Sequence, residues 1–190
     1  MTAMTTTHPH KQAAKHLAAL ILCLTAALFS LASCAKKGEF DPPTGWQLAS
    51  DEAADFYFYV PDNWTVDYST AAAGAYYSAS DPSSVSVIAW ELPNTDTSLD
   101  DWWEMNREEL EKVFTGFTLE SEENLTLTPD NLYAKRYVYT ADLGGYTYRY
   151  MQAAALKGTS VYLFTYCSLP ENYDAHLENV EDMLGFFIIK

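Results

Sequence analysis

The chain has 190 residues, of which 26 are acidic and 11 are Lys or Arg, so its formal net charge is −15 at pH 7. This length suits one domain with an adequate core, and it disfavours a two-lobed solute-binding protein. An acidic surface of this kind repels phosphate backbones, which argues against nucleic acid as a partner.

The N-terminal residues have the layout of a bacterial export signal. Residues 1–16 contain two lysines and no acidic residue, and residues 17–33 form an uncharged run rich in Leu and Ala. The run ends in Leu31-Ala32-Ser33-Cys34, which resembles the lipobox of bacterial lipoproteins. In such proteins the cysteine receives a diacylglyceryl group and becomes the first mature residue, so the resemblance predicts lipid attachment at Cys34. The alternative is an uncleaved helix, because 17 uncharged residues reach the lower end of the length that spans a bilayer.

Cleavage before Cys34 would divide the chain into a signal peptide (1–33), a lipidated N-terminus and tether (34–50) and a domain (51–190). The tether contains Lys36-Lys37 and a Pro-Pro-Thr-Gly stretch, with no hydrophobic period. All 26 acidic residues but only 9 of the 11 basic ones follow residue 33, so the mature chain has a formal charge of −17. We therefore expect the lipid and the two lysines to hold the protein at the membrane.

Few residues of the mature chain are suited to catalysis or metal binding. Only Cys34, Cys167 and His176 remain, because Cys23 and the other three histidines belong to the signal peptide. This excludes an internal disulfide framework and a zinc site built from several histidines. Cys167 lies in a strongly apolar run, which predicts a buried and unreactive thiol. We expect His176 at the surface or at an edge of the domain.

The domain opens with short extended runs. Residues 56–60 are aromatic and β-branched, turn at Pro61-Asp62-Asn63, and resume as an extended run over 64–68. Two further runs, 75–80 and 85–91, flank an Asp-Pro-Ser-Ser turn in which Pro fixes φ and Asp caps the turn. These runs predict antiparallel strands.

A helical period follows. Ser98 and Asp101 have the spacing of a capping box, and the acidic first turn suits the helix dipole. The residues expected on the buried face recur with a helical period, and they are Leu99, Trp103, Asn106, Leu110, Val113 and Phe114. This pattern predicts one amphipathic helix over residues 98–115.

Strands then return over 118–126, 132–140, 146–156 and 159–168, with glycine-containing turns before the third and the fourth. In the last strand apolar residues occupy both alternate positions, so the sheet requires cover on both faces. A second capping box, Ser168 with Glu171, precedes the apolar stripe of a second helix, in which Tyr173 and Leu184 take part. The predicted fold is α+β, an antiparallel sheet between helices in the order βββ-α-ββββ-α.

This order resembles the PsbP-like family, which is named for the extrinsic photosystem II protein and contains many bacterial lipoproteins. The matching stretches are Phe56-x-Phe58-x-Val60-Pro61-x-x-Trp64, Ser80-Asp81-Pro82-Ser83, Arg136-Tyr137-x-Tyr139, Lys157-Gly158 before Tyr162, and Met183-Leu184-Gly185-Phe186. The resemblance implies an α/β/α sandwich over nearly all of the mature domain. Photosystem function does not carry over, because the metal-binding histidines of some plant members have no counterpart here. Gly185 also departs from the serine usual in that ending.

Two groups of residues invite a functional interpretation. Trp102 and Trp103 are neighbours on the predicted helix, about 100° apart, so one of them is expected to border an exposed groove and contact a ligand. The carboxylates of 96–101 and 120–123 lack the alternating spacing of a calcium loop, which favours a solvated face and no metal site. Neither group comes with the nucleophile and base that an enzyme would need.

The sequence therefore predicts a membrane-tethered lipoprotein on the extracytoplasmic face of the cell membrane, acting without catalysis or a cofactor as a binding or accessory module. Its expected partners are the membrane, through the N-terminal lipid, and an envelope protein or polysaccharide. One alternative is a polysaccharide-binding module that uses Trp102 or Trp103. Another is a small envelope hydrolase that uses His176 with Asp174 or Glu178, but residues two apart on a helix point in different directions.

Overall fold

The computed structural model describes residues 41–69, 73–93, 96–127 and 131–190. The elements below all belong to one compact unit, Pro42–Lys190, which we call the second unit because it follows the N-terminal residues. The predicted signal peptide and Cys34 lie outside the described residues.

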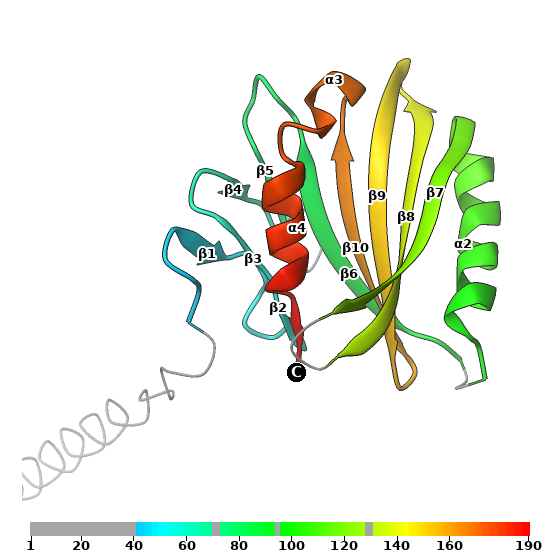
Figure 1. Ribbon diagram of the computed structural model, residues 1–190, viewed down its shortest axis with the longest axis horizontal. Helices are drawn as coiled ribbons and strands as arrows, with labels where there is room; N and C mark the ends of the chain where they lie inside the picture. Colours follow the sequence, from blue (N-terminus) through cyan, green and yellow to red (C-terminus); the bar gives the residue numbers. More distant parts are fainter. Residues whose placement is uncertain (1–40, 70–72, 94–95, 128–130) are drawn as a thin grey trace, which may run out of the picture. The chain divides into compact units, whose positions relative to one another are not determined.

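A seven-stranded antiparallel sheet forms the centre of the second unit, in the order β4-β5-β6-β10-β9-β8-β7 (Figure 1). Its last four members in this order are long and form a meander, because strands that follow one another in the sequence pair with each other antiparallel. The strands are β4 (Thr65–Val66), β5 (Ala73–Tyr76), β6 (Ser84–Glu91), β7 (Thr115–Leu127), β8 (Leu132–Leu143), β9 (Tyr146–Lys157) and β10 (Ser160–Ser168).

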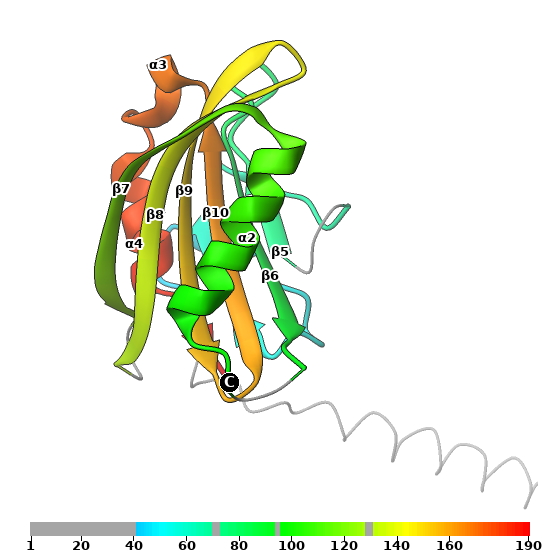
Figure 2. The same ribbon diagram turned by 90° about the vertical axis from the view of Figure 1, so that its right-hand side faces the viewer.

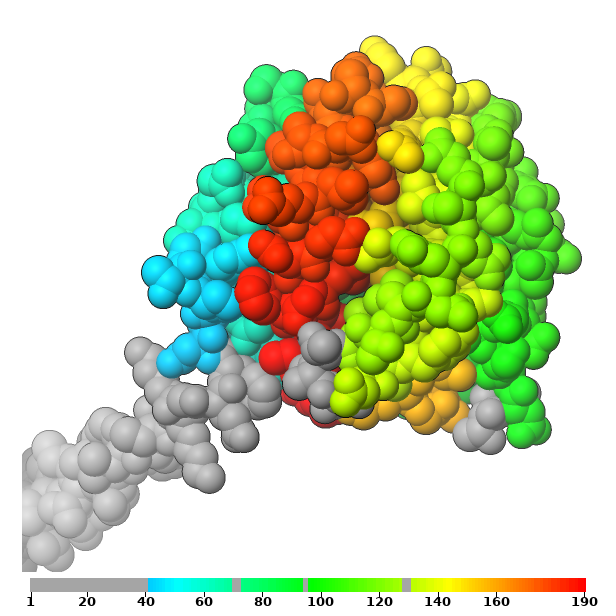
Figure 3. Space-filling view, in the orientation of Figure 1, coloured from blue at the N-terminus to red at the C-terminus, as the bar shows by residue number. Residues whose placement is uncertain are grey.

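Helices cover both faces of this sheet. Helix α2 (Leu99–Val113) crosses one face in front of β8, β9 and β10 (Figure 2). The short helix α3 (Pro170–Tyr173) and α4 (Leu177–Gly185) lie on the other face, and they form an outer ridge in the space-filling view (Figure 3). The predicted sheet between helices is thus confirmed in its layers.

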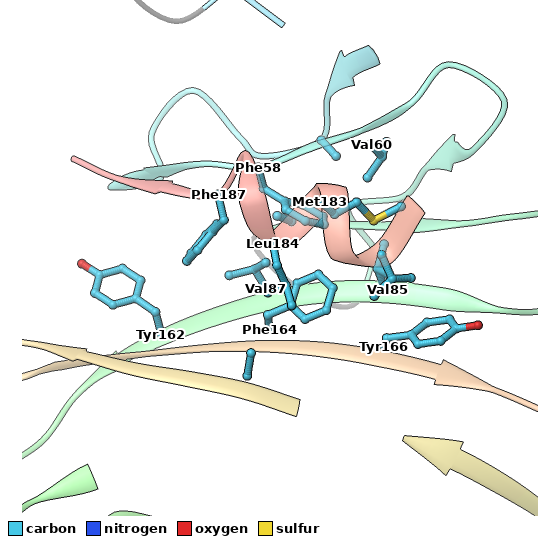
Figure 4. Close-up of a cluster of buried hydrophobic side chains, with 14 of the residues drawn as sticks. Phe58, Val60, Val85, Val87, Tyr162, Phe164, Tyr166, Met183, Leu184 and Phe187 are labelled. Atoms are coloured by element: carbon cyan, nitrogen blue, oxygen red, sulfur yellow. The ribbon is translucent and has the colours of Figure 1, made fainter. Parts of the chain in front are cut away.

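Two buried clusters fill the spaces between the layers, and the alternation along β10 separates them. Phe164 and its alternate neighbours Tyr162 and Tyr166 belong to the larger cluster, which packs beneath α4 (Figure 4). Val161 and Leu163 point the other way, into the cluster beneath α2. A strand that is apolar at successive positions therefore packs on both faces, as the sequence predicts.

The predicted order βββ-α-ββββ-α is wrong in its details. The run predicted over 56–60 divides into β2 (Phe56–Tyr57) and β3 (Tyr59–Pro61), which have different partners. Strand β2 pairs with the C-terminal β11 (Ile188–Ile189), whereas β3 pairs with β1 (Trp46–Leu48). The division falls at Phe58, whose amide donates to Ser50 Oγ and whose carbonyl accepts from the Ala49 amide.

Strand β1 also changes the domain boundary expected from the sequence, and β11 is a further short strand that the sequence did not predict. Strand β1 lies within the stretch predicted as tether, so the fold begins earlier than residue 51. Trp46 packs edge-on against Phe186, with ring centroids 5.0 Å apart, and thereby joins β1 to the end of α4. Both strands have three residues or fewer, and so short a pattern carries no periodic signal.

The two predicted capping boxes have different outcomes. At α2 the box is confirmed, because the Asp101 amide donates to Ser98 Oγ at 3.1 Å and the Asp101 carboxylate accepts from the Ser98 amide. Val113, predicted on the buried face, is 69% exposed at the last turn of that helix. The box predicted at Ser168 is wrong, because this hydroxyl bonds to Ser83 and to the Leu169 carbonyl.

The predicted second helix is interrupted. It forms α3 and α4, with a turn at residues 174–176 between them. Tyr173 and Leu184 are buried in the same cluster as predicted, so the apolar stripe is right although the helix is not continuous.

Candidate functional site

His176 lies in the turn before α4 and is buried, with 6% of its surface exposed. Its Nε2 lies 2.7 Å from Oδ2 of Asp81, which stands in the turn between β5 and β6. The imidazole also packs against two aromatic rings, with centroid distances of 4.2 Å to Tyr77 and 5.5 Å to Trp64. The expectation of a surface or edge histidine is therefore wrong, because a carboxylate 95 positions away binds it inside the domain.

The hydrogen bonds continue from Asp81 into the protein. Oδ1 of Asp81 accepts from the Ser83 hydroxyl at 2.6 Å and from the Ser83 amide at 3.1 Å. The Ser83 hydroxyl lies 2.7 Å from that of Ser168 at the end of β10. We call Asp81, Ser83, Ser168 and His176 the Asp81 network. It joins the β5–β6 turn, the end of β10 and the start of α4.

The electrostatics of the network favour an ionised carboxylate. Burial alone would raise the pKa of Asp81, but the hydrogen bonds from His176 and Ser83 outweigh it and lower the pKa below its ordinary value. The network thus gives the buried Asp81 carboxylate and the two serine hydroxyls hydrogen-bond partners inside the protein.

The order of the network does not suit nucleophilic catalysis. In a serine hydrolase the imidazole stands between the hydroxyl and the carboxylate, so that it can take the hydroxyl proton. Here the carboxylate of Asp81 stands in the middle and forms hydrogen bonds with both the Ser83 hydroxyl and the His176 imidazole. Ser83 and Ser168 are also buried, with 0% and 1% of their surface exposed, so a substrate does not reach them. This arrangement fixes a turn and a helix start.

The partners predicted for a hydrolase are wrong as well. Asp174 has 83% of its side chain exposed and lies 3.5 Å from Arg149, and Glu178 is exposed on α4. The pairing that sequence reasoning missed is that of Asp81 with His176, which is structural. Its only sequence signal is the Asp-Pro-Ser-Ser turn, which predicts a capped turn and not its distant partner.

Trp102 and Trp103 are both buried, with 4% and 2% of their surface exposed. Trp103 stacks on Tyr137 of β8 with 3.5 Å between ring centroids, and Trp102 packs against Trp90 at the end of β6. The expectation of an exposed groove at either indole is therefore wrong. Helix α2 crosses the sheet obliquely, so two neighbouring positions both face its strands. Neither ring face is open to a ligand.

Cys167 is half-buried on the α2 side of β10, in the alternation that the sequence predicts. Burial raises the pKa of its thiol to about 11, despite the opposing effect of a hydrogen bond with Tyr150. Since the thiolate is the reactive form, this environment suits an inert structural cysteine.

We expect native Cys167 to react slowly with a thiol reagent at neutral pH, because a pKa of about 11 leaves little thiolate. The measurement is the rate of modification in a Cys34→Ala background in buffer and in denaturant, with the rate rising strongly on unfolding. Equal rates in the two solvents would contradict the inert assignment.

The carboxylates of 120–123 take part in ion pairs with cations of the sheet. Lys135 bonds to Glu122 and to Asp100 of α2, and the Arg136 guanidinium bonds to Glu123 of β7 and to Glu181 of α4. The third cation, Arg149, bonds to Glu120 of β7 and to Asp174. Each cation thus serves two carboxylates, one from β7 and one from a segment outside the sheet. No group of metal-ligating side chains occurs in the described ranges.

An open pocket of about 130 Å³ lies at the other edge of the sheet. The alternation along β5 and β6 places its side chains on the same side as α2, because the intervening Ala75 and Val85 belong to the cluster beneath α4. We call it the strand-edge pocket, and its lining residues are Asp67, Gly74, Ala75, Tyr76, Ser84, Val85 and Ser86.

The seven-stranded antiparallel sheet with helices on both faces is a PsbP-like α+β fold. The chain is similar to the solution structure of cyanobacterial PsbP (CyanoP) from Synechocystis sp. PCC 6803, with 16% sequence identity and a TM-score of 0.57 over 85% of this chain and 99% of that one. It is also similar to LpqN of Mycobacterium tuberculosis, with 17% identity and a TM-score of 0.58 over 76% of this chain and 90% of that one. At these identities the likeness concerns the fold.

Comparisons of sequence add nothing to this, since no protein-family model and no curated protein matches the chain. Within the described residues, no helix combines the length and the apolar character needed to cross a membrane.

Proposed function

We propose that this protein is a lipid-anchored accessory module of the cell envelope, held on the extracytoplasmic face of the membrane and acting by binding without catalysis. The non-enzymatic part is supported by the Asp81 network, in which the carboxylate separates the serine from the histidine. The location is supported by Leu-Ala-Ser-Cys at the end of the apolar run. A structural neighbour, LpqN, is described as involved in cell envelope biogenesis, and we extend an envelope role to this chain.

The partners in this proposal are the membrane, through the lipid on Cys34, and a component of the envelope. The strand-edge pocket favours a polysaccharide over a protein as that component, because it is small, polar and open. This replaces the saccharide site predicted at Trp102 and Trp103, which are buried.

We expect cells expressing the full chain to incorporate radiolabelled palmitate into it, because the Cys34 thiol accepts the diacylglyceryl group in a lipoprotein. The Cys34→Ala variant is expected to lose the label completely. The matched control is Cys167→Ala, which should retain it. The measurements are autoradiography of the purified protein and its distribution between membrane and soluble fractions.

Equal labelling of the Cys34→Ala variant would contradict the lipid anchor. The non-enzymatic part is tested separately on the same preparations with ester, peptide and glycoside substrates. Any hydrolytic turnover that His176→Ala abolishes would contradict it, provided that the variant remains folded.

A further inference from the structure

We propose that the strand-edge pocket binds one ring of an uncharged saccharide. This inference rests on the proposed binding role and names the chemical class of its ligand. It follows from the size of the pocket, the polar groups that converge on it, the charge around it and the exposed ring at its rim.

The size of the pocket fits a ring with hydroxyl substituents. Its volume of about 130 Å³ is roughly ten times the space of about 10–15 Å³ that one water molecule requires. Gly74 lies in its lining and contributes no side chain, so the β5 backbone itself forms part of the surface. A Cβ at this position would lie 2.9 Å from the carbonyl of Asp67, the residue directly after β4, so the close approach of this backbone to β5 requires glycine.

Three polar side chains line the pocket. The hydroxyls of Ser84 and Ser86 can each donate one hydrogen bond and accept two. Asp67 adds a carboxylate whose pKa is lowered by hydrogen bonds from the Ser69 side chain and amide, so it is ionised at neutral pH. A mixture of hydroxyls and one acceptor-only group matches the hydroxyls of a sugar. The negative charge of Asp67, in a chain of net charge −15, disfavours an anionic ligand.

A polar strip extends from the pocket across the sheet. Ser86 stands opposite Thr165 on β10, and Thr165 stands opposite Gln152 on β9. The side-chain NH₂ of Gln152 donates to Thr165 Oγ1 at 3.2 Å. The side-chain oxygen of Gln152, Oε1, has no hydrogen-bond partner among the described residues. Gln152 is 6% exposed, and a buried acceptor of this kind normally has a partner. The strip therefore continues the hydrogen-bonding surface beyond the pocket.

An aromatic ring stands at the rim. Tyr76 lines the pocket and is 38% exposed, so it offers a surface to the apolar face of a sugar ring. On the same side of the sheet, Ile88 is 39% exposed and flanks the polar strip two residues beyond Ser86. Polar groups between two apolar flanks suit the alternation of hydroxyls and C–H groups on a pyranose ring.

The test is a titration of the full chain, in a zwitterionic detergent without sugar groups, with glucose, N-acetylglucosamine and glucuronate. Saturation-transfer NMR is expected to show saturable binding of the two neutral sugars and weaker binding of glucuronate. Tyr76→Ala and Ser86→Ala are each expected to weaken the binding about 3- to 10-fold. The matched control, Tyr146→Ala, removes a tyrosine that is 64% exposed on the β8–β9 hairpin and should leave the affinity unchanged.

Absence of saturable binding by both neutral sugars would overturn this inference, as would equal affinities in Ser86→Ala and in the Tyr146→Ala control. Thermal melts establish whether each variant is folded. If Tyr76→Ala does not fold, the affinity of Ser86→Ala alone tests the saccharide site. If the chain does not bind the neutral sugars but still incorporates palmitate at Cys34, only the saccharide site is rejected. Loss of the label from the unaltered chain rejects the anchored module instead.

Discussion

Replacing Phe164 with alanine is expected to lower the free energy of unfolding by about 3–5 kcal/mol. The side chain is 1% exposed at the centre of β10 and packs edge-on against Phe58, with ring centroids 5.8 Å apart. Leu184 of α4 lies directly above it in Figure 4, so the truncation leaves a cavity between the sheet and the helix. Chemical denaturation monitored by circular dichroism measures the loss.

The control for Phe164 is Tyr146→Ala, which also removes an aromatic ring from a strand of the sheet. Tyr146 is 64% exposed, so its loss is expected to change the free energy of unfolding by less than about 0.5 kcal/mol. A loss at Phe164 no larger than that at Tyr146 would show that the cluster beneath α4 is not the core.

Replacing Asp81 with alanine is expected to cost about 2–4 kcal/mol, because it leaves His176 and Ser83 buried without their shared acceptor. The double variant Asp81→Ala with His176→Ala should lose less than the sum of the single losses, since the two residues interact directly. The control is Asp174→Ala at an exposed position, which should change the free energy of unfolding by almost nothing. Additive losses in the double variant would contradict the pairing.

The same residue predicts a pH dependence. The pKa of Asp81 is lower in the folded protein than in the unfolded chain, where it has its ordinary value. The stability that ionised Asp81 contributes is therefore complete above the unfolded pKa and is lost as the pH falls through the folded pKa. The difference in unfolding free energy between the unaltered protein and Asp81→Ala should therefore shrink below about pH 4. A difference that grows with acidity would reverse the sign and reject the ionised carboxylate.

Much of the fold could be predicted from the sequence where a pattern is long. The strands β7 to β10 and helix α2 have between 9 and 15 residues each, which is enough for period and turn chemistry to agree. Strands β1 and β11 could not be predicted, because each has three residues or fewer and depends on a distant partner. Phe58 illustrates the same limit, since the division between β2 and β3 is set by Ser50 and Ala49.

The candidate site was less accessible to sequence reasoning for a related reason. Trp102 and Trp103 lie 100° apart on the helix, but the stripe that a helix buries is itself at least that wide. Both rings therefore fit beneath α2, where Trp103 stacks on Tyr137 and Trp102 packs at a tilt against Trp90. The partnership of His176 with Asp81 spans 95 positions, and local spacing carries no information about it. Periodicity predicts which face a residue occupies but not which residue stands opposite.

The outer edge of β7 has a consequence for proteins crowded side by side on a surface. This terminal strand is long, and an unprotected edge of 13 residues would invite the sheet of a neighbouring copy to pair with it. Two register shifts, at Thr115/Thr118 and Leu119/Ser121, break its regularity, and the carboxylates of 120–123 stand along it. Their cations come from β8 and β9 of the same molecule, and each cation is shared with a second carboxylate, so this edge keeps a surplus of negative charge. This irregular and negatively charged edge therefore disfavours pairing between the sheets of neighbouring copies, including copies that the proposed lipid anchor would hold side by side.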